Sequence, residues 1–583
     1  MNAPLEDKKI LQAGDPDLWL ETPDLSISVG ELADSVRTGD LHPDSELRVS
    51  AVEGIHTHQK VQNGRRPPYV AEQSIKARCR TELGIIEIRG RMDGWVPAAG
   101  GIPPWIEEIK TSRRQGSAPD PALISIHAAQ LKLYAWMTAL SEGREHINAQ
   151  LTFIHPDSLS ASPVRFEWHI DELAQFATTQ LQAFVDRAMR EEARRGQRDR
   201  RLSTLAYPMA AFRPGQRALA SVAYKAIVDA THQTWLEAPT GLGKTLGVLY
   251  PALRAMPVSD ISRVFYLTAK VQGQNAAEEA LQQLRGSEAL PLASVTITAK
   301  RAACPTPELP CDPAYCPRAK GFYDRLGEGL AELREASHHH HIDRSTIARV
   351  SDSHALCPFE LNLEFARESD VVVADFNYGF DPRVRLQRLL EQSEAKPVFL
   401  IDEAHNLLTR SVDMFSSDLR LASLEAAQTV MAGSDRIDTA LNNLISELQR
   451  LVSENPRDTS WVAKPEAIQA VVSSASDWLI TMAAENDSAK EASILEAWWD
   501  TIRFVECFQG LTDDYEIIVE QSPETRILLA CVQPGQQLQT MFDSARSIVA
   551  FSGTLRPKRW LEARLTTPPD AAWIGFPSPF PPD

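Results

Sequence analysis

The 583-residue sequence predicts an α/β protein, and three stretches support that prediction. Residues 238–245, APTGLGKT, lie between a strand-like QTWLE and a helix-like TLGVLYPALRAM. Residues 398–407, VFLIDEAHNL, begin with four apolar residues, which is typical of a buried parallel strand. Residues 86–89 alternate Ile with Glu and Arg, which is typical of a half-buried strand. Because a chain of this length exceeds a single hydrophobic core, we expect three or four domains.

Composition limits the classes of protein to which the chain can belong. No run of about 18 apolar residues is present, and the N-terminus lacks the apolar core of a signal peptide, so we expect a cytoplasmic protein with no membrane partner. The seven cysteines of such a protein should not form disulfides. The net charge of −18 argues against a nucleic-acid partner, but residues 411–540 contain 21 Asp and Glu against 8 Lys and Arg. The rest of the chain is near charge balance, so local basic grooves for DNA remain possible.

The APTGLGKT stretch has the spacing of a phosphate-binding loop: a small residue, four positions, then Gly-Lys-Thr. Gly241 and Gly243 allow backbone N–H groups to converge on phosphate oxygens at a helix N-terminus. We expect Lys244 to reach the β- and γ-phosphates of ATP, and Thr245 to hold Mg²⁺. The alternative, a tight glycine turn with a surface lysine, is uncommon at this spacing.

Two carboxylates end the apolar strand of VFLIDEAHNL, at the edge where parallel sheets bind their ligands. We expect Asp402 to take Mg²⁺ through water, and Glu403 to orient or deprotonate the attacking water. We expect His405 to couple the nucleotide state to neighbouring motifs. The alternative, an unrelated acidic loop, would not explain the apolar strand that precedes it.

A second set of candidate catalytic residues lies earlier, on two predicted strands. GIIEIRGRMDGWV contains Asp93, and PPWIEEIKTS contains Glu108 and Lys110. Two such carboxylates can bind one or two Mg²⁺ or Mn²⁺ ions that activate water, while a lysine steadies the attacking water or the charged phosphorane. A two-strand, metal-dependent nuclease requires this set of residues.

Here the sequence resembles the RecB-like branch of the PD-(D/E)XK nucleases, over roughly residues 45–170. In that branch a helix with a G-x-x-x-H pattern precedes the two strands, and a Q-x-x-x-Y helix follows them. This chain has Gly54 and His58 before the strands, and Gln130 and Tyr134 after them. The resemblance implies that His58 is a metal ligand together with the two carboxylates, and the alternative is a polar helix residue.

Residues near the phosphate loop also resemble known motifs. Arg213 and Gln216 resemble the adenine-reading element of superfamily 2 helicases, and the alternative is a helix N-terminus with proline. Downstream, SRVFYLTAKVQGQ predicts a strand that closes on Thr268 and Ala269, followed by Gln274. That arrangement suits contacts with the phosphates of single-stranded DNA.

Four cysteines, Cys304, Cys311, Cys316 and Cys357, follow the spacing C-x6-C-x4-C-x40-C. Three of them precede proline, and thiolates in such loops suit a soft metal or an iron–sulfur cluster. Zinc also accepts four thiolates, but structural zinc sites usually have tighter C-x2–4-C pairs. The spacing therefore favours a [4Fe–4S] cluster.

Together, EAPTGLGKT, the four cysteines, DVVVADFNYGFDPRV and LIDEAHNL resemble the XPD/DinG family of iron–sulfur superfamily 2 helicases, over about residues 205–583. The resemblance implies ATP-driven movement in the 5′ to 3′ direction on single-stranded DNA or DNA junctions, in DNA repair or processing. It also implies that Ser552-Gly553-Thr554-Leu555 links the ATP site to DNA movement.

These motifs set the expected domain boundaries. We expect a PD-(D/E)XK mixed α/β nuclease domain over 1–185, an Arg-rich linker over 186–204, a RecA-like parallel-sheet motor domain over 205–299 and 361–408, an iron–sulfur insertion over 300–360, an α-helical arch over 409–543, and the end of the motor domain over 544–583. The family also has a second RecA-like domain, for which the residues after Thr554 are too few. We therefore expect a truncated copy, or a partner chain that supplies that domain.

Three further stretches each allow two interpretations. The seven arginines between 187 and 201 suit either a phosphate backbone or, more commonly, a solvated helix end and linker. The four histidines at 338–341 suit either a metal or pH-sensitive loop or an exposed polar loop. The acidic residues of 410–540 suit either a shell that repels DNA into a channel or a plain solvated helical surface.

The leading hypothesis is an ATP-dependent DNA helicase fused to a Mg²⁺-dependent nuclease. One alternative is a truncated, motor-incompetent protein that binds DNA and ATP and retains only nuclease or binding activity. Another is a nucleotide switch stabilised by zinc.

Overall fold

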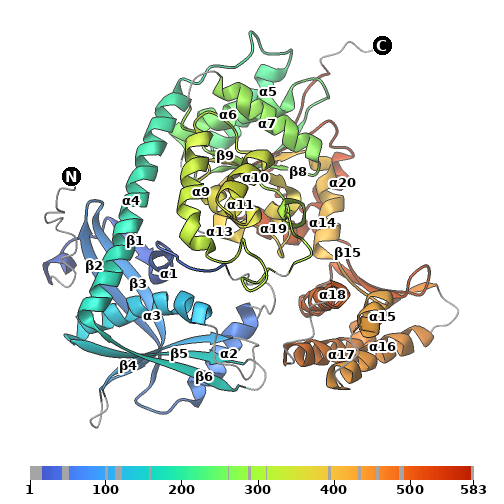
Figure 1. The fold of residues 1–583 in the computed structure, drawn as a ribbon. Helices are drawn as coiled ribbons and strands as arrows, with labels where there is room; N and C mark the ends of the chain where they lie inside the picture. The colour runs from blue at the N-terminus through green and yellow to red at the C-terminus, as the bar shows by residue number, and fades with distance from the viewer. Residues whose placement is uncertain are drawn as a thin grey trace. The chain divides into compact units, whose positions relative to one another are not determined.

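The computed structural model describes residues 16–41, 51–98, 103–111, 121–155, 159–259, 261–286, 290–309, 311–390, 395–430, 435–454, 459–484 and 492–578. The chain forms two compact units (Figure 1). Unit 1 comprises residues 1–193, 310–324 and 483–486, and unit 2 comprises 194–309, 325–482 and 487–583. Within the described residues, no helix is both long enough and apolar enough to cross a membrane.

Unit 1 is built on a six-stranded sheet in the order β1-β3-β4-β5-β6, with β2 paired to β3. The pairs β1/β3 and β4/β5 are parallel and the other pairs are antiparallel, which confirms the predicted mixed sheet. Its apolar core includes Ile86, Ile88 and Ile106 from the sheet, and Leu131 and Ala135 from helix α3. The elements of the sheet and its helices are η1 (Pro16–Trp19), β1 (Leu25–Ser28), α1 (Val29–Ala33), α2 (Ala51–Gly64), β2 (Val70–Thr81), β3 (Gly84–Val96), β4 (Trp105–Thr111), α3 (Pro121–Glu142), β5 (His146–Ile154) and β6 (Ala161–His169).

Part of the predicted iron–sulfur insertion, residues 310–324, belongs to unit 1. Its backbone bonds to the segment that follows α1: Leu41 N donates to Ala319 O at 2.8 Å, and Tyr323 N donates to Gly39 O at 3.0 Å. The Arg37 guanidinium lies 4.6 Å from the centre of the Tyr323 ring. The predicted insertion over 300–360 is therefore divided between the two units.

Helix α4 (Ile170–Ser203) is 34 residues long. Its first half buries Leu173, Ala177, Leu181 and Phe184 in the core of unit 1, and these residues share one helical face. The predicted Arg-rich linker over 186–204 is helical, because α4 continues to Ser203, and the boundary between the two units falls within it, after Ala193. Arginine is a good helix former, so an arginine-rich run does not end a helix.

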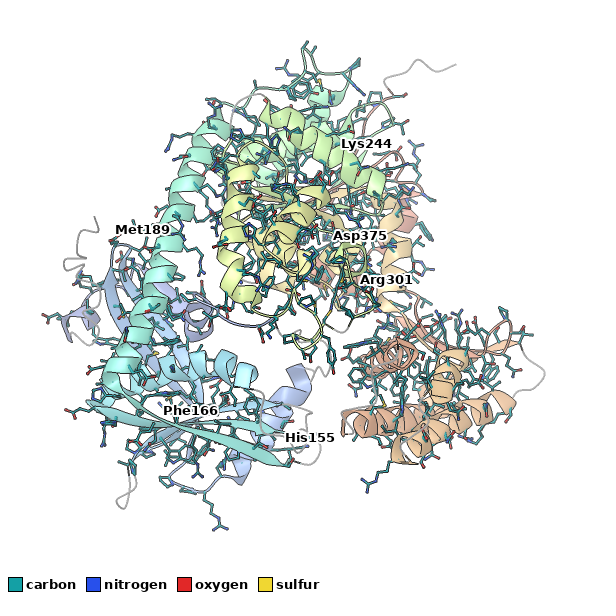
Figure 2. The ribbon with its side chains drawn as sticks, viewed as in Figure 1. His155, Phe166, Met189, Lys244, Arg301 and Asp375 are labelled. Atoms are coloured by element: carbon teal, nitrogen blue, oxygen red, sulfur yellow. The ribbon has the colours of Figure 1, made fainter. Side chains whose placement is uncertain are left out.

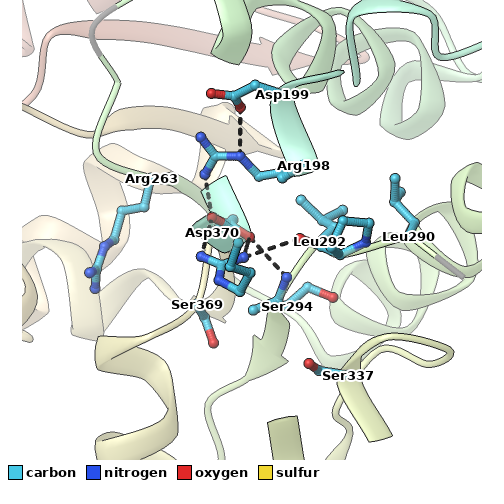
Figure 3. A network of polar contacts seen from close by, with 12 residues as sticks. Arg198, Asp199, Arg263, Leu290, Leu292, Ser294, Ser337, Ser369 and Asp370 are labelled. Atoms are coloured by element: carbon cyan, nitrogen blue, oxygen red, sulfur yellow. Dashed lines mark hydrogen bonds and ion pairs between the residues drawn. The ribbon is translucent and has the colours of Figure 1, made fainter. Parts of the chain in front are cut away.

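Two arginines of this run are structural, and Figure 3 shows one of them, Arg198, beside Asp370. Arg194 contacts the carboxylate of Asp370 at 2.5 and 2.9 Å, and Arg198 contacts the same carboxylate. Asp370 Oδ2 also accepts from Ala293 N at 2.9 Å, just ahead of β9. Burial by itself would raise the pKa of Asp370, yet the two guanidinium groups lower it to about 2. Arg194 and Arg198 therefore hold the end of α4 to unit 2.

Replacing Asp370 with alanine should destabilise unit 2 by about 3–5 kcal/mol, because the buried Arg198 and the partly buried Arg194 would lose the buried carboxylate that they share. The urea midpoint of unfolding would report the change. Asp199→Asn is the matched control, because Asp199 also contacts Arg198, at 2.8 Å, but is about a third exposed. Similar midpoints for the two variants would contradict the structural role of Asp370.

The seven-stranded sheet of unit 2 has the order β17-β7-β16-β11-β8-β10-β9. All of its pairings are parallel, and β7, β8, β11 and β16 are almost wholly buried. A parallel sheet places the carboxyl ends of its strands at one edge. Its strands are β7 (Gln233–Glu237), β8 (Val264–Thr268), β9 (Ser294–Thr296), β10 (Val371–Asp375), β11 (Val398–Asp402), β16 (Ser547–Ser552) and β17 (Ala572–Gly575). The helices between them include α5 (Gln216–Val228), α6 (Lys244–Ala255), α7 (Val271–Arg285), α8 (Lys300–Ala303), α9 (Phe322–Ser337), α10 (Arg344–Ser353), α11 (Pro358–Arg367), α12 (Phe376–Phe380), α14 (Leu407–Phe415), α19 (Gly535–Phe542) and α20 (Lys558–Arg564).

The prediction of a wholly helical arch is wrong. The described residues between 417 and 531 form a four-stranded antiparallel sheet in the order β12-β15-β14-β13, together with four helices. In β14 the buried Ile517 and Val519 alternate with more exposed residues. Such an alternation in a short apolar run is the sequence pattern that indicates a strand. Such runs are ambiguous when helices surround them. The elements are β12 (Ser417–Arg420), α15 (Leu421–Val430), α16 (Asp435–Ser453), β13 (Ser460–Ala463), α17 (Pro465–Ala484), α18 (Ala492–Gln509), β14 (Tyr515–Glu520) and β15 (Arg526–Cys531).

Candidate functional site

The APTGLGKT stretch forms the predicted strand, loop and helix in unit 2. Strand β7 ends at Glu237, and α6 begins at Lys244, which Figure 2 labels. Gly241 and Gly243 have φ angles of +84° and +77°, a left-handed conformation that glycine adopts without strain. The loop therefore turns its backbone toward the start of α6, as a phosphate site requires.

This loop and the two predicted carboxylates line one cleft of about 370 Å³. The cleft joins the phosphate loop, the end of β8, the start of α7 and the end of β11. Its lining residues are Arg213, Gly241, Gly243, Lys244, Thr245, Thr268, Lys270, Gln272, Gly273, Ala276, Asp402 and Glu403. Thr268, which the sequence analysis placed near the phosphates of single-stranded DNA, lines this cleft. No sequence pattern indicated Lys270 and Gln272, which also line the cleft and lie two and four positions beyond the end of β8.

The wall of the cleft at β11 has features that suit a phosphate-bound Mg²⁺. Asp402 is 6% exposed, and its burial raises its pKa, with the charge of Glu403 adding to the rise. The hydroxyl of Thr268 is buried and has no hydrogen-bond partner among the described residues. A Cβ at Gly273 would collide with that hydroxyl and lie 3.0 Å from Asp402 Oδ2, so glycine keeps the space open. Hard oxygen donors around such a space fit Mg²⁺.

Glu403 has a strained backbone and a polar connection to the neighbouring strand. Its φ angle of +49° is uncommon for a residue other than glycine, and such strain is often found at functional sites. His405 Nδ1 lies 2.7 Å from Ser552 Oγ and 3.2 Å from Glu403 Oε2. Ser552 Oγ also donates to Glu403 Oε2 at 3.4 Å. The three side chains thus connect the end of β11 with the end of β16, where the SGTL motif begins.

Arg213 and Gln216 lie beside the phosphate loop. Arg213 donates to the carbonyl of Gly241 at 2.9 Å, and Gln216 Nε2 donates to the carbonyl of Gly243 at 2.9 Å. Gln216 Oε1 accepts from Arg213 N at 3.0 Å and from Tyr207 OH at 2.7 Å. Both predicted residues therefore bond to the loop itself.

The predicted nuclease residues of unit 1 come together at β3 and β4. The register pairs Gly94 with Glu107, which brings Asp93 and Glu108 opposite each other on neighbouring strands. Asp93 Oδ2 accepts from Ile109 N at 2.6 Å. His58 on α2 lies with its Nδ1 3.6 Å from Asp93 Oδ1.

Lys110 joins this group to α3. Its Nζ contacts Glu108 Oε1 at 2.8 Å and Gln130 Oε1 at 3.3 Å. Gln130 Nε2 in turn donates to Tyr134 OH at 3.3 Å, and Tyr134 OH donates to the carbonyl of Arg91 at 3.1 Å. The Q-x-x-x-Y pair therefore holds the lysine and the strand that carries Asp93.

Glu108 has the features of a carboxyl group that can bind a cation. It is 3% exposed, and its Oε2 is buried without a hydrogen-bond partner among the described residues. Burial raises its pKa to about 7, with Asp93 adding to the rise and Lys110 opposing it. A carboxyl group of this kind suits a divalent cation, which would supply the missing partner. Nevertheless, the described residues contain no group of three or more His, Cys, Asp or Glu side chains arranged to hold a metal ion.

Glu107, next to Glu108 on β4, is bound by residues that no sequence pattern indicated. Glu107 is 1% exposed and accepts from Thr152 Oγ1 at 2.6 Å, from Gln150 Nε2 at 3.0 Å and from Arg65 just after α2. On the same helix, Gln62 Nε2 donates to the carbonyl of Asp93 at 3.0 Å. These bonds hold α2, and with it His58, against the sheet.

The structure places the four candidate cysteines and the four histidines at 338–341 in different environments. None of the four cysteines forms a disulfide and all are partly exposed, with Cys311 and Cys316 in unit 1 and Cys304 and Cys357 in unit 2. The prediction of an exposed loop is wrong for His341, which is 6% exposed and lies 2.9 Å from Ser294 Oγ and 2.8 Å from Thr296 Oγ1. Burial lowers the pKa of His341 to about 3, so this side chain is a neutral structural group.

Comparison with known proteins adds to this geometry. Residues 291–424 match the family model DEAD_2. The ATP-dependent DNA helicase CHL1 of Candida glabrata is 23% identical over 249 residues, which are 37% of this chain and 29% of that protein. This chain therefore resembles DEAD_2 helicases. The regulator of telomere elongation helicase 1 homolog of Culex quinquefasciatus is 33% identical over 109 residues, which are 18% of this chain and 11% of that protein. The similarity thus spans less than a third of either relative.

Two solved structures are also similar to the chain. The structure described as XPD_Helicase has 15% sequence identity and a TM-score of 0.42, with 63% of each chain covered. The structure described as Truncated XPD has 16% identity and a TM-score of 0.42, and the similarity covers 62% of this chain and 99% of that one.

Proposed function

We propose that the chain is an ATP-dependent DNA helicase whose nucleotide site is the cleft of unit 2. The observation that carries this proposal is the cleft itself, which brings Lys244 and Thr245 from the phosphate loop to Asp402 and Glu403. The resemblance to DEAD_2 helicases supports DNA as the partner. The proposal also includes movement from 5′ to 3′ on single-stranded DNA or DNA junctions, in DNA repair or processing. It further includes a cytoplasmic location and a partner chain that supplies a second motor domain.

In this proposal the phosphate loop, Asp402 and Glu403 have separate roles in hydrolysis. Backbone N–H groups of the loop and Lys244 hold the β- and γ-phosphates. Thr245 and Asp402 would hold Mg²⁺, which when bound neutralises charge that develops on the phosphates. Glu403 orients the attacking water and accepts its proton. Ser552 and His405 contact Glu403, so movement of β16 would change the position of the base.

DNA-stimulated ATP turnover is the measurement that tests this function. We expect single-stranded DNA to raise the rate of ATP turnover, and Lys244→Ala to remove it while DNA binding persists. Turnover that is absent both with and without DNA would favour the alternative, a motor-incompetent protein that binds DNA and ATP.

We propose that unit 1 is a nuclease that uses Mg²⁺ or Mn²⁺. The contacts among His58, Asp93, Glu108 and Lys110 support it, because two carboxylates and an imidazole can hold a cation beside a lysine. When bound, that cation would activate a water for attack on a phosphodiester. Lys110 would stabilise the negative charge that forms on the phosphorus centre.

We propose that Cys304, Cys311, Cys316 and Cys357 ligate a [4Fe–4S] cluster. Anaerobically purified protein should contain about four iron atoms per chain and show a broad absorption band near 400 nm, since thiolate-bound clusters absorb there. Cys316→Ser should remove both, whereas Cys79→Ser should not, because Cys79 is buried in the core of unit 1. One equivalent of zinc without iron would instead support the zinc-stabilised switch.

A further inference from the structure

The side chain of Gln216 is fully engaged in bonds within the protein. Its Oε1 accepts from Tyr207 OH at 2.7 Å and from Arg213 N at 3.0 Å, and an amide oxygen has two lone pairs. Its Nε2 donates to the carbonyl of Gly243 at 2.9 Å, which leaves one N–H. The residue is 2% exposed. It can therefore offer a nucleotide one donor and no acceptor.

The hydrogen-bonding groups that Gln216 has left determine which bases it can distinguish. Adenine presents the N7 acceptor together with the N6 donor, whereas guanine presents N7 together with the O6 acceptor. To select adenine, an amide must accept from N6 through its oxygen. In this chain Tyr207 and Arg213 occupy that oxygen, so only N7 is left to recognise, and both purines share it.

The neighbouring groups do not supply the missing selectivity. Arg213 is the one cleft residue from the segment before α5, and its guanidinium donates to Gly241 O at 2.9 Å. An arginine plane or an aromatic ring stacks on any base without selecting it. The other described residues of the cleft come from the phosphate loop, the ends of β8 and β11, and the first two turns of α7 with the residue before it, where phosphates and Mg²⁺ are expected.

We infer that the nucleotide site does not discriminate adenine from guanine, and that the chain accepts purine nucleoside triphosphates generally. This inference rests on the proposed nucleotide hydrolysis and names the substrate class of that site. Gln216 is then a positioning residue of the phosphate loop. Its amide fills the place where a Cβ at Gly243 would lie, and it holds the Gly243 carbonyl.

The test compares kcat/KM for ATP and GTP with Mg²⁺ and single-stranded DNA. We expect the two values to agree within about tenfold, because sites that select by hydrogen bonding reject the wrong substrate by about 10⁴–10⁵-fold. A preference for ATP of more than a hundredfold would overturn the inference.

The variant Gln216→Ala separates positioning from base recognition. If the residue acts through the loop, kcat/KM falls by the same factor for ATP and GTP. A loss confined to ATP would show that Gln216 recognises adenine, and the inference would be wrong. Since this variant could fold poorly, the wild-type protein provides an independent measurement: GTP and ATP should displace a fluorescent ATP analogue at similar concentrations.

The displacement measurement also separates this inference from the proposed function. Equal displacement without turnover would contradict the motor function and uphold the purine-general site. Selective displacement by ATP with normal turnover would do the reverse. A protein that binds neither nucleotide would contradict both.

Discussion

Replacing Glu403 with glutamine should lower DNA-stimulated ATP turnover by about 10²–10⁴-fold, the usual contribution of a general base. The amide keeps the size of the side chain and its contact with Ser552, but it cannot take the proton of the attacking water. Lys244 and the loop are unchanged, so the affinity for ATP should remain within a few fold. Single-turnover hydrolysis and a separate binding titration would distinguish the two effects.

Asp413→Asn is the matched control for this prediction. Asp413 is an exposed carboxylate on α14, the helix that follows the DEAH stretch, and it does not line the cleft. Its replacement should leave turnover unchanged. If Glu403→Gln turned over ATP within threefold of the wild type, Glu403 would not be the base.

Asp93→Asn and Lys110→Ala should each lower Mg²⁺-dependent DNA cleavage by about 10³-fold or more, because metal and charge stabilisation together contribute several kcal/mol to such reactions. Asn keeps the acceptor for Ile109 N but loses the charge that would hold the cation. Cleavage of end-labelled DNA, followed with Mg²⁺ or Mn²⁺, is the measurement.

Lys76→Ala is the control for Lys110→Ala, because Lys76 is a half-exposed lysine of the same sheet that pairs with Glu87. All three variants should retain DNA-stimulated ATP turnover, which shows that unit 2 is folded, and the full activity of Lys76→Ala in cleavage would show that unit 1 tolerates loss of a lysine from its sheet. Undiminished cleavage by both Asp93→Asn and Lys110→Ala would contradict the nuclease proposal.

Local patterns predicted most of the residues that line the two candidate sites. The phosphate loop depends on the spacing of a few neighbouring residues, and Asp402 and Glu403 directly follow an apolar strand. The pair Gln130 and Tyr134 lies on one helical face because residues four apart always do. In each case, the residues that act together are neighbours in sequence or in register, so spacing alone places them.

The predictions from sequence failed where the residues that contact each other lie far apart in the chain. Arg198 and Asp370 are 172 positions apart, and only their meeting shows that one arginine of the run is buried against a carboxylate. The arch sheet was missed because its strands are short and separated by helices. His341 is buried by contacts with Ser294 and Thr296, which are also remote in sequence.

The APTGLGKT loop, the Asp402-Glu403 pair and the order of the nuclease motifs were determined by the sequence itself, because local backbone chemistry demands those residue types at those spacings. Only the tertiary structure decided how the side chains are shared. Tyr207 and Arg213 occupy the oxygen of Gln216, and Glu107 binds Arg65 instead of joining the acidic site. The physical reason is that a buried polar group takes whichever partner the fold brings near it, and the spacing of residues does not specify that partner.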